Sequence, residues 1–226
     1  MNVPSDADSA HELLIRDLAA DLKPVRRLRP PSVRTFSWLL IVAATAVILA
    51  IIADLSALGH RLAAARDLWL AVTGSALTAI LAAFAAFQLS LPDARRAWAL
   101  LPLPATLLWI IASGFGCLGV WFVPGTHAAD LSEARDCLMF IIGLSVPLSA
   151  LLVIMLRRGC PLQPGLTAAT AGLAAAAAAA TLLNFFHPFD AAATDLAVHV
   201  FAVSLVIAAN RALSGRLLAT NFHAAT

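Results

Sequence analysis

Six long apolar stretches alternate with short polar connections along the chain. Each stretch is close to the roughly 20 residues that an α-helix needs to cross a bilayer. Pro102 and Pro104 interrupt the third stretch, but neighbouring helices can satisfy the freed carbonyls, so we expect a single span there. The pattern predicts six transmembrane helices at about 36–53, 68–89, 98–121, 137–156, 166–186 and 196–213.

The predicted fold class is therefore an all-α integral membrane protein, a bundle of six transmembrane helices with a short cytoplasmic amino-terminal amphipathic helix. We expect an amino-terminal segment at 1–34, a transmembrane domain at 35–215 and a tail at 216–226. Hydrophobic residues make up 61% of the chain and charged residues 12%, against roughly 45–50% and 25% in soluble domains. The net charge of +2 gives no indication of nucleic-acid binding.

The positive charges fall mainly on one side of the predicted bundle. Twelve of the 15 Lys and Arg residues lie in the amino segment and in the connections on that side. The other side has only Arg61, Arg66 and Arg135. By the positive-inside rule, both termini are expected on the cytoplasmic side of the membrane.

Small residues recur every fourth position in two of the predicted spans. Close backbone approach supplies much of the association energy between helices in lipid, so such rows predict packing faces. The two rows are Gly74, Thr78, Ala82 and Ala86 in the second span, and Ala168, Gly172, Ala176 and Ala180 in the fifth.

The polar amino segment contains one short helical pattern. Leu14, Leu18 and Leu22, together with Ile15, fall on one face, and Lys23-Pro24 ends the pattern. One interpretation is an interfacial helix that lies on anionic membrane lipid. The other is a helix whose apolar face docks into the groove of a cytoplasmic partner.

Two of the three cysteines are expected at the outer membrane face. Cys117 lies near the end of the third span and Cys137 begins the fourth, whereas Cys160 lies on the cytoplasmic side. The outer pair can be inert small hydrophobic residues. Two thiols at an oxidising face can instead form a disulfide or bind a soft metal ion.

Other ionisable residues near the outer face could complete a metal or polar site, although its metal is unknown. The candidates are His187, Asp190, Asp195 and His199. The central parts of the spans contain almost no ionisable residues, which disfavours an ion or proton transporter. The glycines from Gly114 to Gly119 match the letters of a dinucleotide-binding motif, but they lie inside an apolar span and not between a strand and a helix. We find no other catalytic motif and therefore do not expect an enzyme.

Several short motifs follow one another along nearly the whole chain, and together they resemble the NrsF family. They are Leu14-Ile15-Arg16-Asp17-Leu18 with Lys23-Pro24, Trp98-Ala99-Leu100-Leu101-Pro102, Gly116-Cys117, Cys137-Leu138, Arg157-Arg158-Gly159, and Phe186-His187-Pro188 with Asp190. The resemblance implies a six-span inner-membrane anti-sigma factor that inhibits an extracytoplasmic-function sigma factor of the sigma-F type.

The resemblance also suggests which residues receive a signal and which transmit it. The two functional cysteines of the family map onto Cys117 and Cys137, which would sense oxidative or heavy-metal stress, with a soft metal ion as one candidate signal and no resident cofactor. Cys160 is not part of that pattern. The sigma-binding residues would be Leu14, Ile15, Leu18 and Leu22. The alternative function is a small-solute transporter or permease-like membrane protein.

Overall fold

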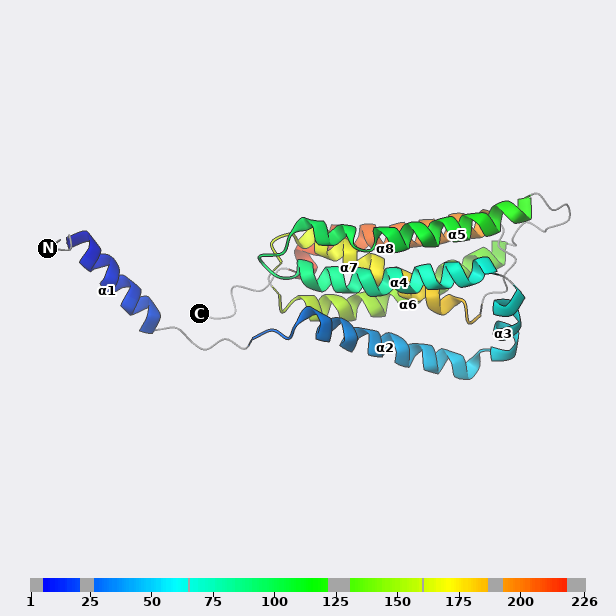
Figure 1. The fold of residues 1–226 in the computed structure, drawn as a ribbon, viewed down its shortest axis with the longest axis horizontal. Helices are drawn as coiled ribbons and strands as arrows, with labels where there is room; N and C mark the ends of the chain where they lie inside the picture. The colour runs from blue at the N-terminus through cyan, green and yellow to red at the C-terminus, as the bar shows by residue number, and fades with distance from the viewer. Residues whose placement is uncertain are drawn as a thin grey trace.

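In the computed structural model, the protein is an elongated bundle of antiparallel helices with one helix standing apart (Figure 1). The structure describes residues 6–20, 27–64, 66–121, 131–159, 161–186 and 193–218. Six helices in these ranges are long and apolar enough to cross a membrane. The predicted all-helical bundle of six spans is confirmed.

The helix order is simple, and each long helix runs opposite to the one before it (Figure 1). The first span is α2 (Pro31–Ile52), and α4 (Arg66–Leu89) is the second. The remaining four are α5 (Leu103–Trp121), α6 (Leu131–Leu156), α7 (Pro164–Leu183) and α8 (Ala193–Leu218). We call the end where α2 begins the Arg34 end, and the end where α6 begins the Cys137 end.

The structure differs from the sequence-based prediction in one connection and in one span. The segment after the first span, expected as a polar connection, forms the short helix α3 (Leu55–Ala64), which lies across the Cys137 end (Figure 1). The third span is interrupted: the 3-10 helix η1 (Arg96–Leu100) and a turn precede α5. A proline is well tolerated in the first turn of a helix but not within it, so the helix restarts at Leu103 with Pro104 next.

The centre of the bundle is α7, which packs against α4, α6 and α8. Both predicted rows of small residues are buried, at the contacts of α7 and at the contact of α4 with α5. A Cβ at Gly74 would lie 2.8 Å from the backbone nitrogen of Trp109 on α5, and one at Gly172 would lie 3.1 Å from Cα of Ile207 on α8. The predicted packing faces are confirmed, since the backbones approach too closely for larger side chains.

The first span is different, because most of α2 faces outward. Its buried residues are Arg34, Thr35 and Trp38, all within the first eight residues of the helix. Farther along, Val47 and Ile51 are exposed, as expected of a helix that faces lipid. The amino-terminal helix α1 (Asp6–Ala20) stands apart from the bundle (Figure 1).

Candidate functional site

The Cys137 end brings together two residues that the sequence analysis named separately. Cys137 lies in the second turn of α6, and its Sγ is 3.6 Å from Nε2 and 3.8 Å from Nδ1 of His199 on α8. The cysteine is only 3% exposed. A thiol can donate its proton to a neutral imidazole, and a thiolate can accept one from the ring N–H. Thiolate and imidazole are also the usual nitrogen and sulfur ligands of Zn²⁺ and other soft ions.

An apolar cluster surrounds this pair. Ile141 on α6, Leu183 on α7 and Ala202 on α8 are buried with Cys137. Phe140 packs against Phe186 at the end of α7, with ring centroids 5.8 Å apart. The cluster shields most of the thiol from water.

The other predicted site residues at this end are only partly described. Cys117 lies on α5, four residues before that helix ends at the Cys137 end, and Asp195 lies one turn before His199 on α8; the side chains of both are outside the described residues. His187 and Asp190 also lie outside them, as does Cys160. Within the described part of the chain, no group of three or more His, Cys, Asp or Glu side chains could hold a metal ion.

The Arg34 end contains a charged contact that the sequence analysis did not identify. Arg34 belongs to the positively charged amino segment of the sequence, but its side chain is only 6% exposed. Its Nη1 donates a hydrogen bond to Ser90 Oγ at the end of α4 over 3.1 Å, and its Nη2 donates one to the carbonyl of Met155 on α6. The guanidinium carbon lies 4.6 Å from the ring centroid of Phe87. These contacts satisfy a charge that would otherwise be costly to bury.

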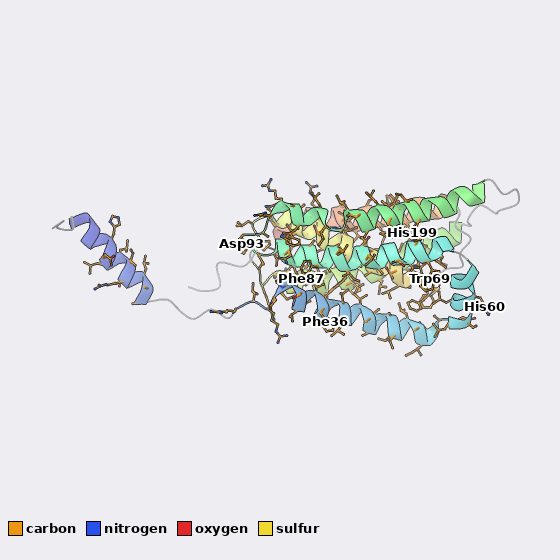
Figure 2. The ribbon with its side chains drawn as sticks, viewed as in Figure 1. Phe36, His60, Trp69, Phe87, Asp93 and His199 are labelled. Atoms are coloured by element: carbon orange, nitrogen blue, oxygen red, sulfur yellow. The ribbon has the colours of Figure 1, made fainter. Side chains whose placement is uncertain are left out.

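Trp38, one turn farther along α2, makes a second contact with the same helix. Its Nε1 donates a hydrogen bond to the carbonyl of Leu148 on α6 over 3.2 Å, and its ring is fully buried. Together, Arg34 and Trp38 attach the start of α2 to two carbonyls of α6. We call this pair of residues the α2 clasp. Figure 2 shows Phe87 near this end of the bundle, and His60 and Trp69 near the other.

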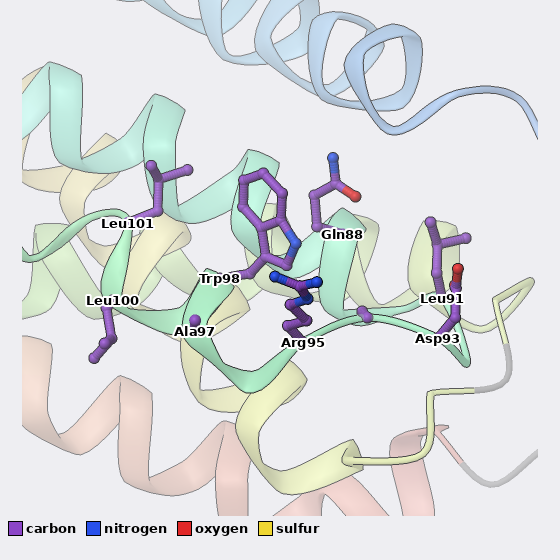
Figure 3. Close-up of a pocket in the computed structure, with 9 residues that line it drawn as sticks. Gln88, Leu91, Asp93, Arg95, Ala97, Trp98, Leu100 and Leu101 are labelled. Carbon is purple, nitrogen blue, oxygen red and sulfur yellow. The ribbon is translucent and has the colours of Figure 1, made fainter.

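The Arg34 end also has an open pocket of about 690 Å³ between α4 and η1 (Figure 3). Trp98 lines it and packs edge-on against Phe84 of α4. The pocket is apolar with one acidic and one basic residue, Asp93 and Arg95, both exposed. It is therefore a second apolar surface at the end of the bundle where the amino-terminal segment joins.

The predicted apolar face of the amino segment is present on α1. Leu14 is 55% exposed, Leu18 63%, and Ile15 is exposed as well. Leu22 lies outside the described residues. Exposed leucines on one face of a helix are typical of a segment that binds a partner or a membrane surface.

The comparisons with known proteins identify one family. The profile of NrsF, described as negative regulator of sigma F, matches residues 18–219. No curated protein and no solved structure matches the chain. The match covers most of the chain, including all six spans, and the resemblance seen in the sequence is confirmed. The chain therefore belongs to the NrsF family of negative regulators of sigma F.

Proposed function

We propose that the protein holds an extracytoplasmic-function sigma factor inactive at the inner membrane and releases it when a thiol site at the outer face is oxidised or binds a soft metal ion. The proposal rests chiefly on the contact of the Cys137 thiol with His199 at the Cys137 end. Helix α1 joins the bundle at the opposite end, the Arg34 end. A negative regulator of this kind requires a group that a signal can change and a surface that holds the sigma factor. It has no catalytic step of its own.

The orientation follows from the arginines. Arg27 and Arg29 precede α2 at the Arg34 end, and the connections there contain Arg95, Arg96, Arg157 and Arg158. Helix α8 ends at the same place with Arg211 and Arg216. We therefore assign the Arg34 end to the cytoplasm. Reporter domains fused after Arg96 or Arg158 should then be active in the cytoplasm, and a periplasmic readout would contradict this assignment.

The sigma factor binds the leucine face of α1. Leu14, Ile15 and Leu18 are exposed, and docking into an apolar groove would remove them from water. Polar side chains such as Arg16 and Asp17 stay at the rim of the contact. Because α1 is attached to a membrane protein, a sigma factor bound to it is also kept away from the chromosome.

The signal acts on the thiols. Oxidation of Cys117 and Cys137 to a disulfide transfers two electrons to the oxidant and releases two protons. In the chain-entropy model, closing a loop of about 20 residues restricts the chain by roughly 3 kcal/mol. A soft ion such as Cd²⁺ would instead take Cys137 and His199 as ligands, with Asp195 one turn away on α8. Either event shifts the bundle only if its two states bind the signal differently.

The test is sigma-dependent transcription before and after challenge with cadmium or a thiol oxidant. The Cys117→Ser and Cys137→Ser double variant should still repress but fail to respond, whereas Cys160→Ser should respond normally. Normal induction in the double variant would refute thiol sensing.

A further inference from the structure

The same helix, α6, carries the thiol at one end and the contacts with α2 at the other. Cys137 and Met155 are 18 residues apart, which is about 27 Å along a helix at 1.5 Å per residue. Pro147 lies between them, inside the helix. It has no N–H for the carbonyl of Gly143, and its ring crowds that carbonyl, so α6 is least supported by its own hydrogen bonds there.

Both contacts of the α2 clasp lie on the far side of Pro147. Trp38 donates to the carbonyl of Leu148, and Arg34 donates to that of Met155. The part of α6 that follows the proline is therefore tied to α2 by these two bonds, and to α8 by the hydrogen bond from Ser149 to Asn210. The part that precedes the proline meets α8 through Cys137 and His199. A proline between two differently attached segments is a natural point for one to tilt relative to the other.

The α2 clasp hydrogen-bonds the start of α2 to the bundle, and Leu39 and Val42 farther along the helix pack against the buried core. The other buried residue of the helix, Thr35, bonds its own backbone at Pro31. Arg34 additionally reaches Ser90 at the end of α4, whose hydroxyl donates to the carbonyl of Phe87. The start of α2 is thus fixed between α4 and α6, and residues 27–30 immediately before it are exposed.

We propose that Arg34 and Trp38 are positioning residues that couple α6 to the amino-terminal segment. A change at the Cys137 end tilts the part of α6 beyond Pro147, and the two carbonyls move the start of α2 and the segment before it. This inference rests on the proposed function for the nature of the signal and for the sigma factor held at α1. Holding the sigma factor does not need the clasp, because α1 offers its leucines outside the bundle.

The first test replaces the two clasp residues one at a time and measures induction of sigma-dependent transcription. Trp38→Phe keeps the ring and loses the N–H, and Arg34→Gln loses the fork of donors. Each should leave repression without challenge unchanged and lower the induced transcription. We expect about a fivefold loss for Trp38→Phe, the effect of one ordinary hydrogen bond on a two-state equilibrium, and at least as large a loss for Arg34→Gln, since Arg34 donates two. Trp69→Phe, at an exposed tryptophan of α4, and Arg29→Gln, at an exposed arginine before α2, are the matched controls.

Two results in that assay would overturn the inference. One is normal induction in both clasp variants. The other is loss of repression without challenge while the protein remains folded in the membrane, because the clasp would then maintain the resting state instead of transmitting a change. Arg34→Lys, which keeps the charge and one donor, should respond between wild type and Arg34→Gln.

The second test separates the coupling from thiol sensing, using the full-length protein in vesicles. Protection of Cys137 from alkylation by cadmium measures the input, and trypsin cleavage after the exposed Arg27 measures the output. We expect cadmium to change the cleavage rate in wild type but not in Trp38→Phe, with Cys137 protected equally in both. Two results contradict the coupling when Cys137 is protected equally in both proteins. One is a cadmium-induced change of the cleavage rate in Trp38→Phe, and the other is no such change in wild type. An unprotected Cys137 contradicts only the proposed signal, and the transcription assay then decides on the clasp.

Discussion

The two ends of α6 are held by different chemistry. At the Cys137 end, a thiol meets an imidazole. The thiol can be oxidised, the imidazole can be protonated, and both can bind a soft metal ion. At the Arg34 end, a guanidinium and an indole donate to backbone carbonyls, which none of these conditions alters. The difference suggests that one end is suited to receive a chemical change and the other to transmit a movement.

The largest effect is expected beyond both ends, on α1. Replacing Leu14 and Leu18 by Asp places two carboxylates on the face that we propose docks with the sigma factor. Each carboxylate costs several kcal/mol if buried unpaired, so affinity for the sigma factor should fall more than about 100-fold. Copurification of the sigma factor with membranes measures this. Ala20→Asp, on the opposite face of the same helix, is the control and should bind normally.

Retention of the sigma factor by the Leu14→Asp and Leu18→Asp double variant would move the docking surface from α1 to the bundle. The apolar pocket around Trp98 at the Arg34 end would then be the next surface to test. The two ends of α6 would still differ in their chemistry, but the signal would no longer reach the sigma factor through the start of α2.

The next effect concerns packing at the Arg34 end. A Cβ at Gly159 would lie 2.6 Å from the carbonyl oxygen of Ser90 and 2.8 Å from its Oγ, the acceptor of Arg34. Gly159→Ala should therefore push α4 away and lower stability by about 2 kcal/mol, within the usual range for overpacking. Thermal unfolding in detergent measures the change.

Gly143→Ala is the matched control for that substitution. It lies on α6 with nothing within 4 Å of the added Cβ. Alanine is the better helix former, so this variant should be as stable as wild type or slightly more so. Equal stability of Gly159→Ala and wild type would mean that the Arg34 end adapts easily, and the contrast with the Cys137 end would weaken.

The spans and α1 could be predicted from sequence because hydropathy and helical spacing are local properties. The break before α5 was only partly visible: Pro102 and Pro104 were noticed, but one apolar stretch still covers both sides of the break. The ten-residue helix α3 was missed because it is too short to span a bilayer and contains Gly59 and His60, which are typical of a connection.

The contacts within the sites depend on which helices become neighbours. Cys137 and His199 were both named, but 62 residues separate them, and only the packing of α6 against α8 brings them together. Arg34 and Trp38, four residues apart, share one face of α2, but the predicted span began only at about residue 36 and left Arg34 in the amino segment. The sequence showed that spacing but not their acceptors, since a backbone carbonyl such as that of Met155 carries no residue-type signal.

A smaller effect is expected from the imidazole at the Cys137 end. If His199 contributes about 1.4 kcal/mol to the binding of a soft ion, His199→Ala should raise the cadmium concentration for half-maximal induction about tenfold. Repression without cadmium should be unchanged, because the imidazole lies far from α1. His60→Ala, at an exposed histidine of α3 near the same end, is the control. An unshifted cadmium response in His199→Ala would leave Cys137 as the sensor without its neighbour.

The smallest effect concerns the middle of the bundle, where α6 and α8 are joined between the two ends. Ser149 Oγ donates a hydrogen bond of 2.6 Å to Oδ1 of Asn210, whose Nδ2 donates to the carbonyl of Val206. Hydrogen bonds between membrane helices contribute about 0.6 kcal/mol on average, so Ser149→Ala should lower the thermal midpoint only slightly.

Ser145→Ala is a close control, because the buried hydroxyl of Ser145 has no hydrogen-bond partner within the described part of the chain. Its removal should be neutral or stabilising. A loss at Ser149 several times larger than this would show that α6 and α8 move as one unit, and the signal would then enter through both helices.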